Sequence, residues 1–559
     1  MTRNFLILLS SILVYLLFFQ NCANPSTPTG GPRDTIPPLL VESAPINKSI
    51  NFKGNRIELI FDEYVKLDQV EQKLIITPTI ESEYKTRFNK DRVTIIFEED
   101  SPFKENTTYT LNFQDAIKDI NESNVWKDPR FVFSTGDYLD SLYVYGNVNF
   151  LMTKEAAKEG IVSLYFIDDT LNVLTDKPPY FTNIDEEGKF IIENLPAATF
   201  NVYAIKDGNN NLILDANSEA YDFTINPVEV LYFKDSIKFQ YQFLNINDIK
   251  IFSTQSIRGN YDISFNKYIT DFNFNTSNYE LYPNFVDEHD KVRFYDKPIS
   301  YPFDSLLVNI EATDSVNNKL DTSLYINFEP YEGPKPDLTQ SFVPENNFEL
   351  KSTLHGFLTF NKPIYKINYD SIFIMYDSVT YQYLDSSNLN YNKYKDQISI
   401  KAKLDKDKLP KNDSTGEVTN KFNLYIGKGS FVSIEQDSSK SINRSYSFYD
   451  PANYGIIKGN INSSVESFTI ELLDTKYNVI DTIKNNSKYV FDKIKPGSYY
   501  IRVLFDVNNN SQWDPGSLLD KQKPEPVIFY YDKATDTRAL SIKANWEMTD
   551  INIDYNPVD

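Results

Sequence analysis

One pattern of alternating residues occurs three times in the chain, and it restricts what the chain can fold into. The copies are Phe61–Val65 (FDEYV), Phe265–Ile269 (FNKYI) and Phe360–Ile364 (FNKPI), each at the end of a strand-like run (IELIF, YDISF and GFLTF). Side chains along a strand point to opposite faces in turn, so a slip of one residue would move every apolar side chain to the wrong face. The same phase at three places therefore predicts three related β-domains.

The composition favours strands over helices along the whole chain. It contains 39 Tyr and 40 Phe among 559 residues, and long amphipathic helical patterns are nearly absent. Aromatic and β-branched residues suit the half-buried surface of a pleated sheet. A chain of this length is also too long for one hydrophobic core. We therefore expect an all-β protein of tandem β-sandwich domains.

The segment 37–137 carries several motifs in a fixed order. They are Pro37-Pro38 at the entry, IELIFDEYV, Ile76-Thr77-Pro78, the TTYTLNF strand, Lys118-Asp119 and a final FVFSTG strand. In this order they resemble the bacterial Ig-like domain of the SbsA type, which implies an Ig-like sandwich and says almost nothing about function. The other two copies of the alternating pattern predict diverged Ig-like domains at 243–331 and 334–451. One larger irregular β-domain in this middle region is the alternative.

A second repeat lies outside those domains. Residues 189–207 (KFIIENLPAATFNVYAIKD) align without a gap to residues 488–506 (KYVFDKIKPGSYYIRVLFD), and Gly146-Asn147-Val148 and Gly459-Asn460-Ile461 precede them as matching first strands. The surrounding segments, 138–240 and 452–557, resemble the transthyretin-like, carboxypeptidase-regulatory type of β-sandwich. The resemblance implies accessory modules without catalytic residues.

The N-terminus has the anatomy of an export signal. An apolar run at 5–19 follows Arg3, and it is shorter than the roughly 20 residues that a membrane-spanning helix needs. Cys22, the only cysteine in the chain, comes directly after it. This arrangement resembles a bacterial lipoprotein signal, which implies a signal peptide at 1–21, a lipid on Cys22 and attachment to the outer membrane. A Pro-rich tether at 22–36 follows. An uncleaved signal anchor with an incidental cysteine is the alternative, and the membrane face stays open.

The second repeat continues into a candidate cation site. Asp207, Asn209, Asn211, Ile213 and Asp215 align with Asp506, Asn508, Asn510, Gln512 and Asp514. Oxygen ligands at positions 1, 3, 5 and 9, with a backbone carbonyl at position 7, are how a loop wraps Ca²⁺. Position 6 holds Leu212 or Ser511 in place of the usual glycine, and Glu219 stands near the place of the usual bidentate acid. The sequence therefore predicts weak Ca²⁺ binding. Turns in which the Asp and Asn side chains satisfy their own backbone are the alternative.

Charge and residue usage exclude several functions. The net charge of −22 argues against nucleic acid as a partner, because phosphate binding needs a basic face. Two histidines and one cysteine leave little material for zinc sites or His-dependent triads. We therefore expect no enzyme activity. The leading hypothesis is an extended string of domains that serves as a lipid-anchored scaffold or binding protein, such as a subunit of an outer-membrane complex with an envelope protein partner. A glycan-binding or adhesive surface lipoprotein is the alternative.

Overall fold

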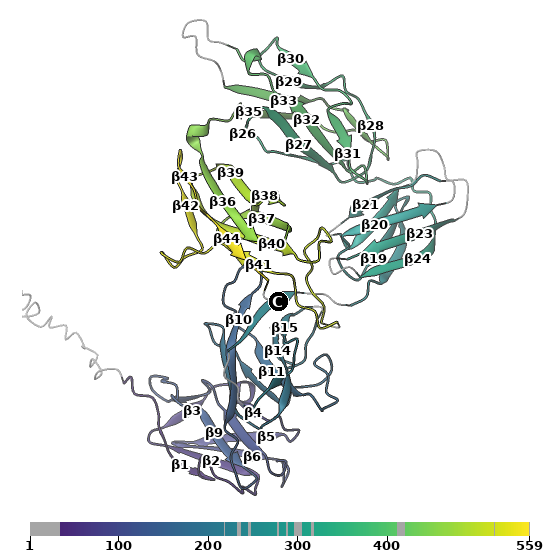
Figure 1. The fold of residues 1–559 in the computed structure, drawn as a ribbon. Coiled ribbons are helices and arrows are strands. Elements are labelled where there is room, and N and C mark those ends of the chain that lie inside the picture. The colour runs from purple at the N-terminus through teal and green to yellow at the C-terminus, as the bar shows by residue number, and fades with distance from the viewer. Residues whose placement is uncertain are drawn as a thin grey trace, which may run out of the picture.

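The structure is a computed structural model. It describes residues 34–557 apart from 217, 232–235, 244–246, 277–278, 287–288, 296–304, 315–317, 411–419 and 519. Five clusters of buried apolar side chains follow one another along the chain, at 57–133, 144–241, 249–326, 338–448 and 457–553. Four of these clusters lie within a predicted range, and the second, which includes Tyr241, extends one residue past the predicted 138–240; we call the five units the first to fifth domains. All five are built of strands, so the expected all-β architecture is confirmed (Figure 1).

The first domain has two main sheets, with the strand orders β1-β2-β6-β5 and β4-β7-β9, and a small β3-β8 pair. Ile57, Leu59 and Phe61 on β2 are buried, as the alternation predicts. Its elements are β1 (Leu40–Ala44), β2 (Arg56–Phe61), β3 (Val65–Leu67), α2 (Val70–Lys73), β4 (Ile75–Thr77), β5 (Tyr84–Asn89), β6 (Arg92–Phe97), β7 (Thr108–Asn112), β8 (Ile117–Asp119) and β9 (Arg130–Ser134).

The second domain is one sheet with the order β12-β11-β14-β15-β17-β10-β13, in which β10 and β17 pair in parallel. Gly146 allows this pairing, because a Cβ there would lie 1.9 Å from the Ile237 carbonyl oxygen. The strands are β10 (Leu142–Phe150), β11 (Ile161–Phe166), β12 (Tyr180–Asn183), β13 (Lys189–Leu195), β14 (Thr199–Ile205), β15 (Ala220–Phe223), β16 (Val228–Glu229) and β17 (Ile237–Phe243).

The third domain packs the sheet β18-β19-β22-β21 against β20-β23-β24. Its strands are β18 (Ile251–Ile257), β19 (Asn260–Phe265), β20 (Asp271–Thr276), β21 (Tyr282–Val286), β22 (Lys291–Tyr295), β23 (Leu306–Thr313) and β24 (Lys319–Ile326).

The fourth domain packs β25-β27-β32-β31 against β26-β35-β33-β29-β30, with a small β28-β34 pair. Its elements are β25 (Gln340–Val343), β26 (Phe348–Leu350), β27 (Thr353–Phe360), β28 (Ile364–Ile367), β29 (Ile372–Met375), β30 (Tyr381–Tyr383), β31 (Leu389–Tyr391), β32 (Gln397–Lys403), η1 (Lys406–Lys408), β33 (Lys421–Ile426), β34 (Phe431–Ser433) and β35 (Ile442–Phe448).

The fifth domain repeats the close backbone approach of the second. A Cβ on Gly459 would lie 1.8 Å from the Ile551 carbonyl oxygen, next to the parallel pairing of β36 with β44. The short helix η2 (Pro451–Asn453) leads into its strands, which are β36 (Gly455–Ser463), β37 (Ser467–Leu473), β38 (Val479–Lys484), β39 (Lys488–Ile494), β40 (Gly497–Asp506), β41 (Val527–Phe529), β42 (Leu540–Ile542), β43 (Glu547–Met548) and β44 (Ile553–Tyr555).

The three copies of the alternating pattern share one hydrogen bond. The second residue of each copy accepts a backbone N–H from the segment that enters its domain: Asp62 from Leu39, Asn266 from Lys250 and Asn361 from Thr339, each at 2.8 Å. The backbone N–H of the same residue donates to the carbonyl of that entering residue. In each of these domains the repeated pattern thus joins the entering segment to the end of the strand that precedes the pattern: β2, β19 and β27.

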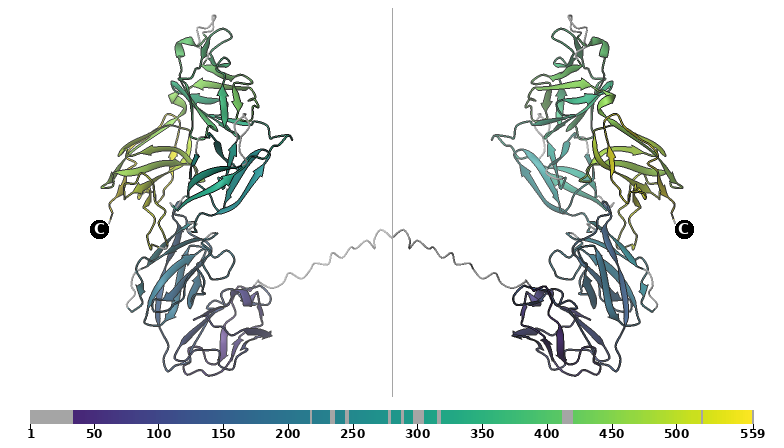
Figure 2. Two further views of the ribbon diagram at one scale, coloured as in Figure 1. Left: turned by 90° about the vertical axis from the view of Figure 1, so that its right-hand side faces the viewer. Right: turned by 90° about the vertical axis from the view of Figure 1, so that its left-hand side faces the viewer.

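The chain does not extend as a string of domains, so that prediction is wrong. It rises from the first domain to the fourth and then returns, which places the fifth domain between the fourth and the second (Figures 1 and 2). Lys351 of the fourth domain forms an ion pair with Asp492 of the fifth. Arg502 of the fifth domain donates to the Met152 carbonyl, 350 positions away, at 2.7 Å. The second to fifth domains therefore form a closed arrangement.

The contact between the second and fifth domains, the 2–5 interface, combines charge and apolar packing. Arg538 donates to the Thr153 carbonyl at 2.6 Å, and Lys523 forms an ion pair with the buried Asp222. The apolar part joins Leu151 and Met152 of the second domain to Leu473, Val527 and Phe529 of the fifth. Burial raises the pKa of Asp222, even though the Lys523 ammonium opposes this shift.

Reversing the charge of Lys523 should open the 2–5 interface. Lys523→Glu places a second carboxylate against the buried Asp222, whereas Lys521→Glu makes the same charge change on an exposed neighbour. Double electron–electron resonance measures the separation of the two domains, with one spin label attached at Lys158 and the other at Thr549, which are both exposed. We expect a longer and broader distance distribution for Lys523→Glu and an unchanged one for Lys521→Glu. Identical distributions for the two variants would contradict the closed arrangement.

Candidate functional site

The structure describes the two predicted Asp/Asn loops but not the predicted lipid anchor. Cys22 and the segment 1–21 lie outside the described residues. Within the described part of the chain, no helix has the length and apolar character needed to cross a membrane. The lipid on Cys22 therefore stays a prediction, while both Asp/Asn loops can be examined directly.

The first Asp/Asn loop follows β14 and folds around its own side-chain oxygens. The Asp207 carboxylate accepts the backbone N–H of Asn211 at 3.2 Å and of Leu212 at 2.9 Å. Asn209 Oδ1 accepts the N–H of Asn211, and Asn211 Oδ1 accepts that of Ile213. The side chains predicted as cation ligands thus hold the turn together.

The second loop, after β40, repeats this arrangement position by position. The Asp506 carboxylate accepts the N–H of Asn510 at 3.0 Å and of Ser511 at 2.8 Å. Asn508 Oδ1 accepts the N–H of Asn510, and Asn510 Oδ1 accepts that of Gln512. The aligned sequences therefore fold into the same loop in both domains.

Both loops make the sharp turn at position 6 without a glycine. Leu212 has φ of 64° and Ser511 has φ of 72°, which are left-handed values that non-glycine residues rarely adopt. Position 4 is also left-handed, at Asn210 and Asn509. Both loops therefore hold residues other than glycine in the left-handed conformation at position 6, and the hydrogen bonds to the carboxylates of Asp207 and Asp506 stabilise this turn.

A glutamate closes each loop in the same way. Glu219 accepts the N–H of Gly208 at 2.9 Å and of Asp215 at 2.8 Å. Glu525 accepts the N–H of Val507 at 2.6 Å and of Asp514 at 2.8 Å, so it occupies the corresponding place in the second loop.

Sequence reasoning suggested Glu219 and missed Glu525. The first stands 12 residues after Asp207 (219 minus 207), the second 19 after Asp506 (525 minus 506). The longer second loop therefore carries no spacing signal for its glutamate.

The protonation of the loop acids follows from these contacts. Burial alone would raise the pKa of Asp506, but hydrogen bonds from Ser467, Ser511 and Asn510 outweigh it and lower the pKa below the ordinary value. For Glu219 burial is the larger effect and raises the pKa, although two backbone N–H groups oppose it. The first acid of the second loop is thus ionised over a wide pH range.

The loops also have an apolar side that packs between domains. Leu214 is buried against the outer face of the second domain, in a cluster that includes Ile75 of the first domain and Leu518 of the fifth. Trp513 packs beside the apolar part of the 2–5 interface, and its Nε1 donates to the Glu525 carbonyl at 3.0 Å. Both loops therefore have a structural role that needs no cation.

The alternative interpretation of the loops explains the hydrogen bonds just described. Side-chain oxygens that accept nearby backbone N–H groups are typical of Asx turns. Among the described residues, no group of three or more His, Cys, Asp or Glu side chains is placed to hold a metal ion. Ca²⁺ binding through Asp215, Asp514 and the other loop oxygens stays a prediction.

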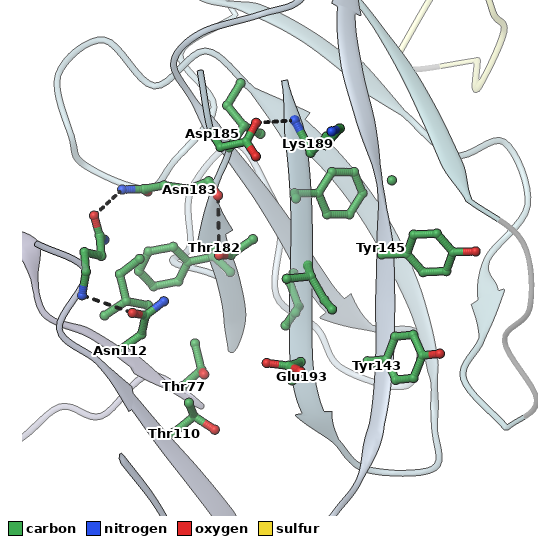
Figure 3. A pocket seen from close by; sticks show the side chains of 18 of the residues that line it. Thr77, Thr110, Asn112, Tyr143, Tyr145, Thr182, Asn183, Asp185, Lys189 and Glu193 are labelled. Carbon is green, nitrogen blue, oxygen red and sulfur yellow. Dashed lines mark hydrogen bonds between the residues drawn. The ribbon is translucent and has the colours of Figure 1, made fainter. Parts of the chain in front are cut away.

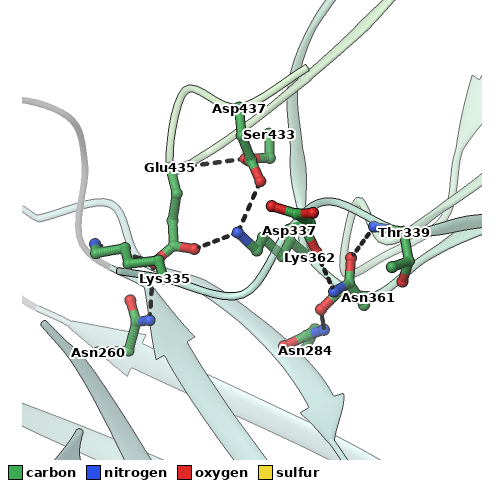
Figure 4. Close-up of polar contacts among 10 residues, drawn as sticks. All are labelled: Asn260, Asn284, Lys335, Asp337, Thr339, Asn361, Lys362, Ser433, Glu435 and Asp437. Carbon is green, nitrogen blue, oxygen red and sulfur yellow. Dashed lines mark hydrogen bonds and ion pairs between the residues drawn. The ribbon is translucent and has the colours of Figure 1, made fainter. Parts of the chain in front are cut away.

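Charged side chains also join the third and fourth domains (Figure 4). The buried Lys362 lies 2.7 Å from Glu435 and 2.9 Å from Asp437, and Glu435 also pairs with Lys335 at 3.0 Å. Asn260 of the third domain donates to the same glutamate at 3.0 Å. Burial raises the pKa of Glu435, but the hydrogen bonds from Lys362, Asn260 and Lys335 lower it overall. Lys362 is the third residue of the repeated pattern Phe360–Ile364, so a segment that the sequence singled out takes part in this contact.

A groove of about 1220 Å³ lies between the first and second domains (Figure 3). Its walls come from β4 and β7 of the first domain and from β10, β12 and β13 of the second. Thr79 donates its backbone N–H to the Pro179 carbonyl at 2.8 Å, and Asn194 Nδ2 donates to Thr110 Oγ1 at 2.9 Å, so both sides are joined directly. The sequence contained no signal for this groove, because its residues come from separate segments of two domains.

Comparison with known proteins supports the first domain. Residues 34–135 match the family described as "Bacterial Ig-like domain", which confirms a bacterial Ig-like domain in this part of the chain. No curated protein matches the chain. The protein is therefore all-β, with multiple β-sheet domains of which the first is a bacterial Ig-like domain.

Solved structures show only remote similarity. The surface layer protein SbsC, domains 1–6, is 10% identical with a TM-score of 0.16, over 91% of this chain and 67% of that one. The major pilin subunit BcpA of Bacillus cereus is 11% identical with a TM-score of 0.14, over 75% and 99%. A Ca²⁺-stabilised, ice-binding adhesin of an Antarctic bacterium is 10% identical with a TM-score of 0.11, over 73% and 94%. Similarity at this level does not indicate a shared function.

Calcium should stabilise the fifth domain if the second loop binds it. With a dissociation constant on the order of 1 mM, about 10 mM Ca²⁺ contributes about 1.4 kcal/mol. Thermal unfolding of the protein with Ca²⁺ and with EDTA measures this gain. Asp506→Ala should abolish the response of the fifth domain to Ca²⁺, whereas Asp520→Ala, on an exposed turn of the same segment, should retain it. Equal melting temperatures in EDTA and in Ca²⁺ would contradict the predicted metal site.

Proposed function

We propose that the protein is a non-enzymatic, lipid-anchored scaffold and binding protein of the bacterial outer membrane, and that it works as a subunit of an envelope protein complex. The observation that carries the proposal is the closed arrangement of the second to fifth domains. Contacts such as that of Arg502 with the Met152 carbonyl hold these four domains as one frame. The first domain, which follows the predicted tether, projects from this frame and forms the groove with the second.

The family match and the roles of the buried charges among the described residues support this proposal. The matched family is that of an Ig-like domain and is no enzyme family. Within the described residues, several buried charges are engaged in structural contacts: Lys362 pairs with Glu435, which accepts a hydrogen bond from Asn260 of the third domain, and Asp222 and Arg502 join the second and fifth domains. These charged groups are thus already used to hold domains together.

The glycan-binding alternative requires a flat, exposed set of aromatic rings. An aromatic cluster does lie on the fourth domain, where Phe373 contacts Tyr381, Tyr383 and Tyr425. The ring of Phe373 is inclined to these three by 89°, 60° and 31°, so the cluster is not coplanar. This geometry favours a protein partner over a sugar face that would stack on parallel rings.

Lipid attachment and partner binding can be tested in the same cells. Labelling with a clickable fatty acid should mark the wild-type protein and leave Cys22→Ser unlabelled, because no other residue offers a thiol. Purification from detergent-solubilised outer membrane should recover a second envelope protein in a constant ratio. A wild-type protein that takes up no label would favour an uncleaved signal anchor. Recovery of the protein alone would contradict the proposed role in a complex, and binding to a glycan array would favour the alternative.

A further inference from the structure

We propose that the groove between the first and second domains binds an extended, net-basic peptide segment of a partner protein. The segment adds as a β-strand to the free edges of β12 and β13. This inference rests on the proposed function as a binding protein and names the site and the chemistry of the partner.

The sheet of the second domain ends at β12 and β13, and both strands line the groove. The backbone groups of antiparallel strands point alternately to one neighbour and to the other side. Val148 donates its N–H to the Gly188 carbonyl at 2.7 Å, which fixes this alternation for β13. Phe190 and Ile192 therefore face β10, and the backbone groups of Ile191 point to the groove; a β-bulge follows Ile192, so the alternation ends there.

The same reasoning applies to β12. Ile184 donates its N–H to the Gly160 carbonyl of the neighbouring strand segment at 3.0 Å. Every second residue before Ile184 therefore faces β11, and the backbone groups of the residues between them, Phe181 and Asn183, point to the groove. Two strand edges with outward backbone donors thus border one groove, although the Asn183 carbonyl already accepts the Thr182 hydroxyl at 3.4 Å. A row of such groups is a template for a further strand.

One position on this edge is already paired by another segment of backbone. Thr79 of the first domain donates its backbone N–H to the carbonyl of Pro179, just before β12 begins, at 2.8 Å. Phe181 and Asn183 are the next positions of the same edge. The first domain thus covers the start of the edge and leaves the following positions for an incoming strand.

The side chains of the groove suit a strand with alternating character. Ile75, Phe181 and Phe190 are buried along its floor, while Tyr143 and Ile191 are each 46% exposed. An incoming strand would therefore place apolar side chains on the floor and polar ones in the solvent. The volume of about 1220 Å³ exceeds that of an ordinary small-molecule pocket, which is roughly 300–1000 Å³.

The charge of the groove favours a basic segment. Arg130 forms an ion pair with Glu193, and Lys189 forms one with Glu187. Asp185 leaves the lining with one carboxylate in excess. The whole protein carries a net charge of −22, which attracts a basic partner over a longer range.

The test is selection of phage-displayed random twelve-residue peptides on the full-length protein in detergent, followed by binding measurements with the enriched peptide. We expect enriched sequences that alternate apolar and polar residues and carry Lys or Arg. Amide exchange should slow at Ile191 and Asn183 when the peptide binds. Enrichment of no such sequence, or slower exchange only at other sites, would overturn the proposal.

Variants at one edge position make the test specific. Ile191→Pro removes an N–H that faces the groove and should weaken binding at least tenfold. Val490→Pro makes the same change at the aligned, exposed position of β39 and should leave binding unchanged. Ile191→Lys keeps the N–H but adds a positive charge, so it should weaken binding several-fold without affecting folding. Unchanged binding in Ile191→Lys, or equal losses in Ile191→Pro and Val490→Pro, would overturn the proposal.

Failure of this inference is distinguishable from failure of the proposed function. If a membrane protein co-purifies equally well with Ile191→Pro and with the wild type, the groove is not its binding site, while the role in a complex stands. Preferential binding of neutral oligosaccharides that Ile191→Lys abolishes would likewise overturn the peptide proposal and favour a glycan site.

Discussion

The arrangement of the whole molecule depends on the 2–5 interface. Arg502 and Arg538 each donate to a carbonyl of the second domain, and Lys523 neutralises the buried Asp222. A buried carboxylate without its partner is strongly unfavourable. When the domains separate, Asp222 must therefore become hydrated or protonated. Five small β-domains joined end to end would otherwise move independently, as domains with small interfaces do.

The two repeated Asp/Asn loops contribute to the contacts between domains. The aligned Asp, Asn and Glu side chains shape two loops whose apolar residues, Leu214 and Trp513, pack at or near domain contacts. The carboxylates thus stabilise the left-handed turns, and the apolar residues between them contribute to the packing. A bound cation would strengthen the same loops without changing this role.

The sequence predicted much of the local structure and few of the contacts between domains. Alternation placed Ile57, Leu59 and Phe61 in a core, and alignment of the hairpins predicted that the loops after Asp207 and Asp506 share one fold. Glu525 could not be found in this way, because the extra residues of the second loop break the spacing. The groove was equally hidden, because its walls come from segments that are distant in the chain.

The sequence by itself determined that the chain is all-β, that it carries two kinds of repeat and that one bacterial Ig-like domain stands first. These features depend on residues near one another in the chain, whose alternation and turn chemistry have a fixed period. Only the tertiary structure decided that the chain returns on itself, because Arg502 meets Met152 across 350 positions and no local pattern records such a pairing. It also decided that the ends of one sheet, β12 and β13, stay open beside the first domain.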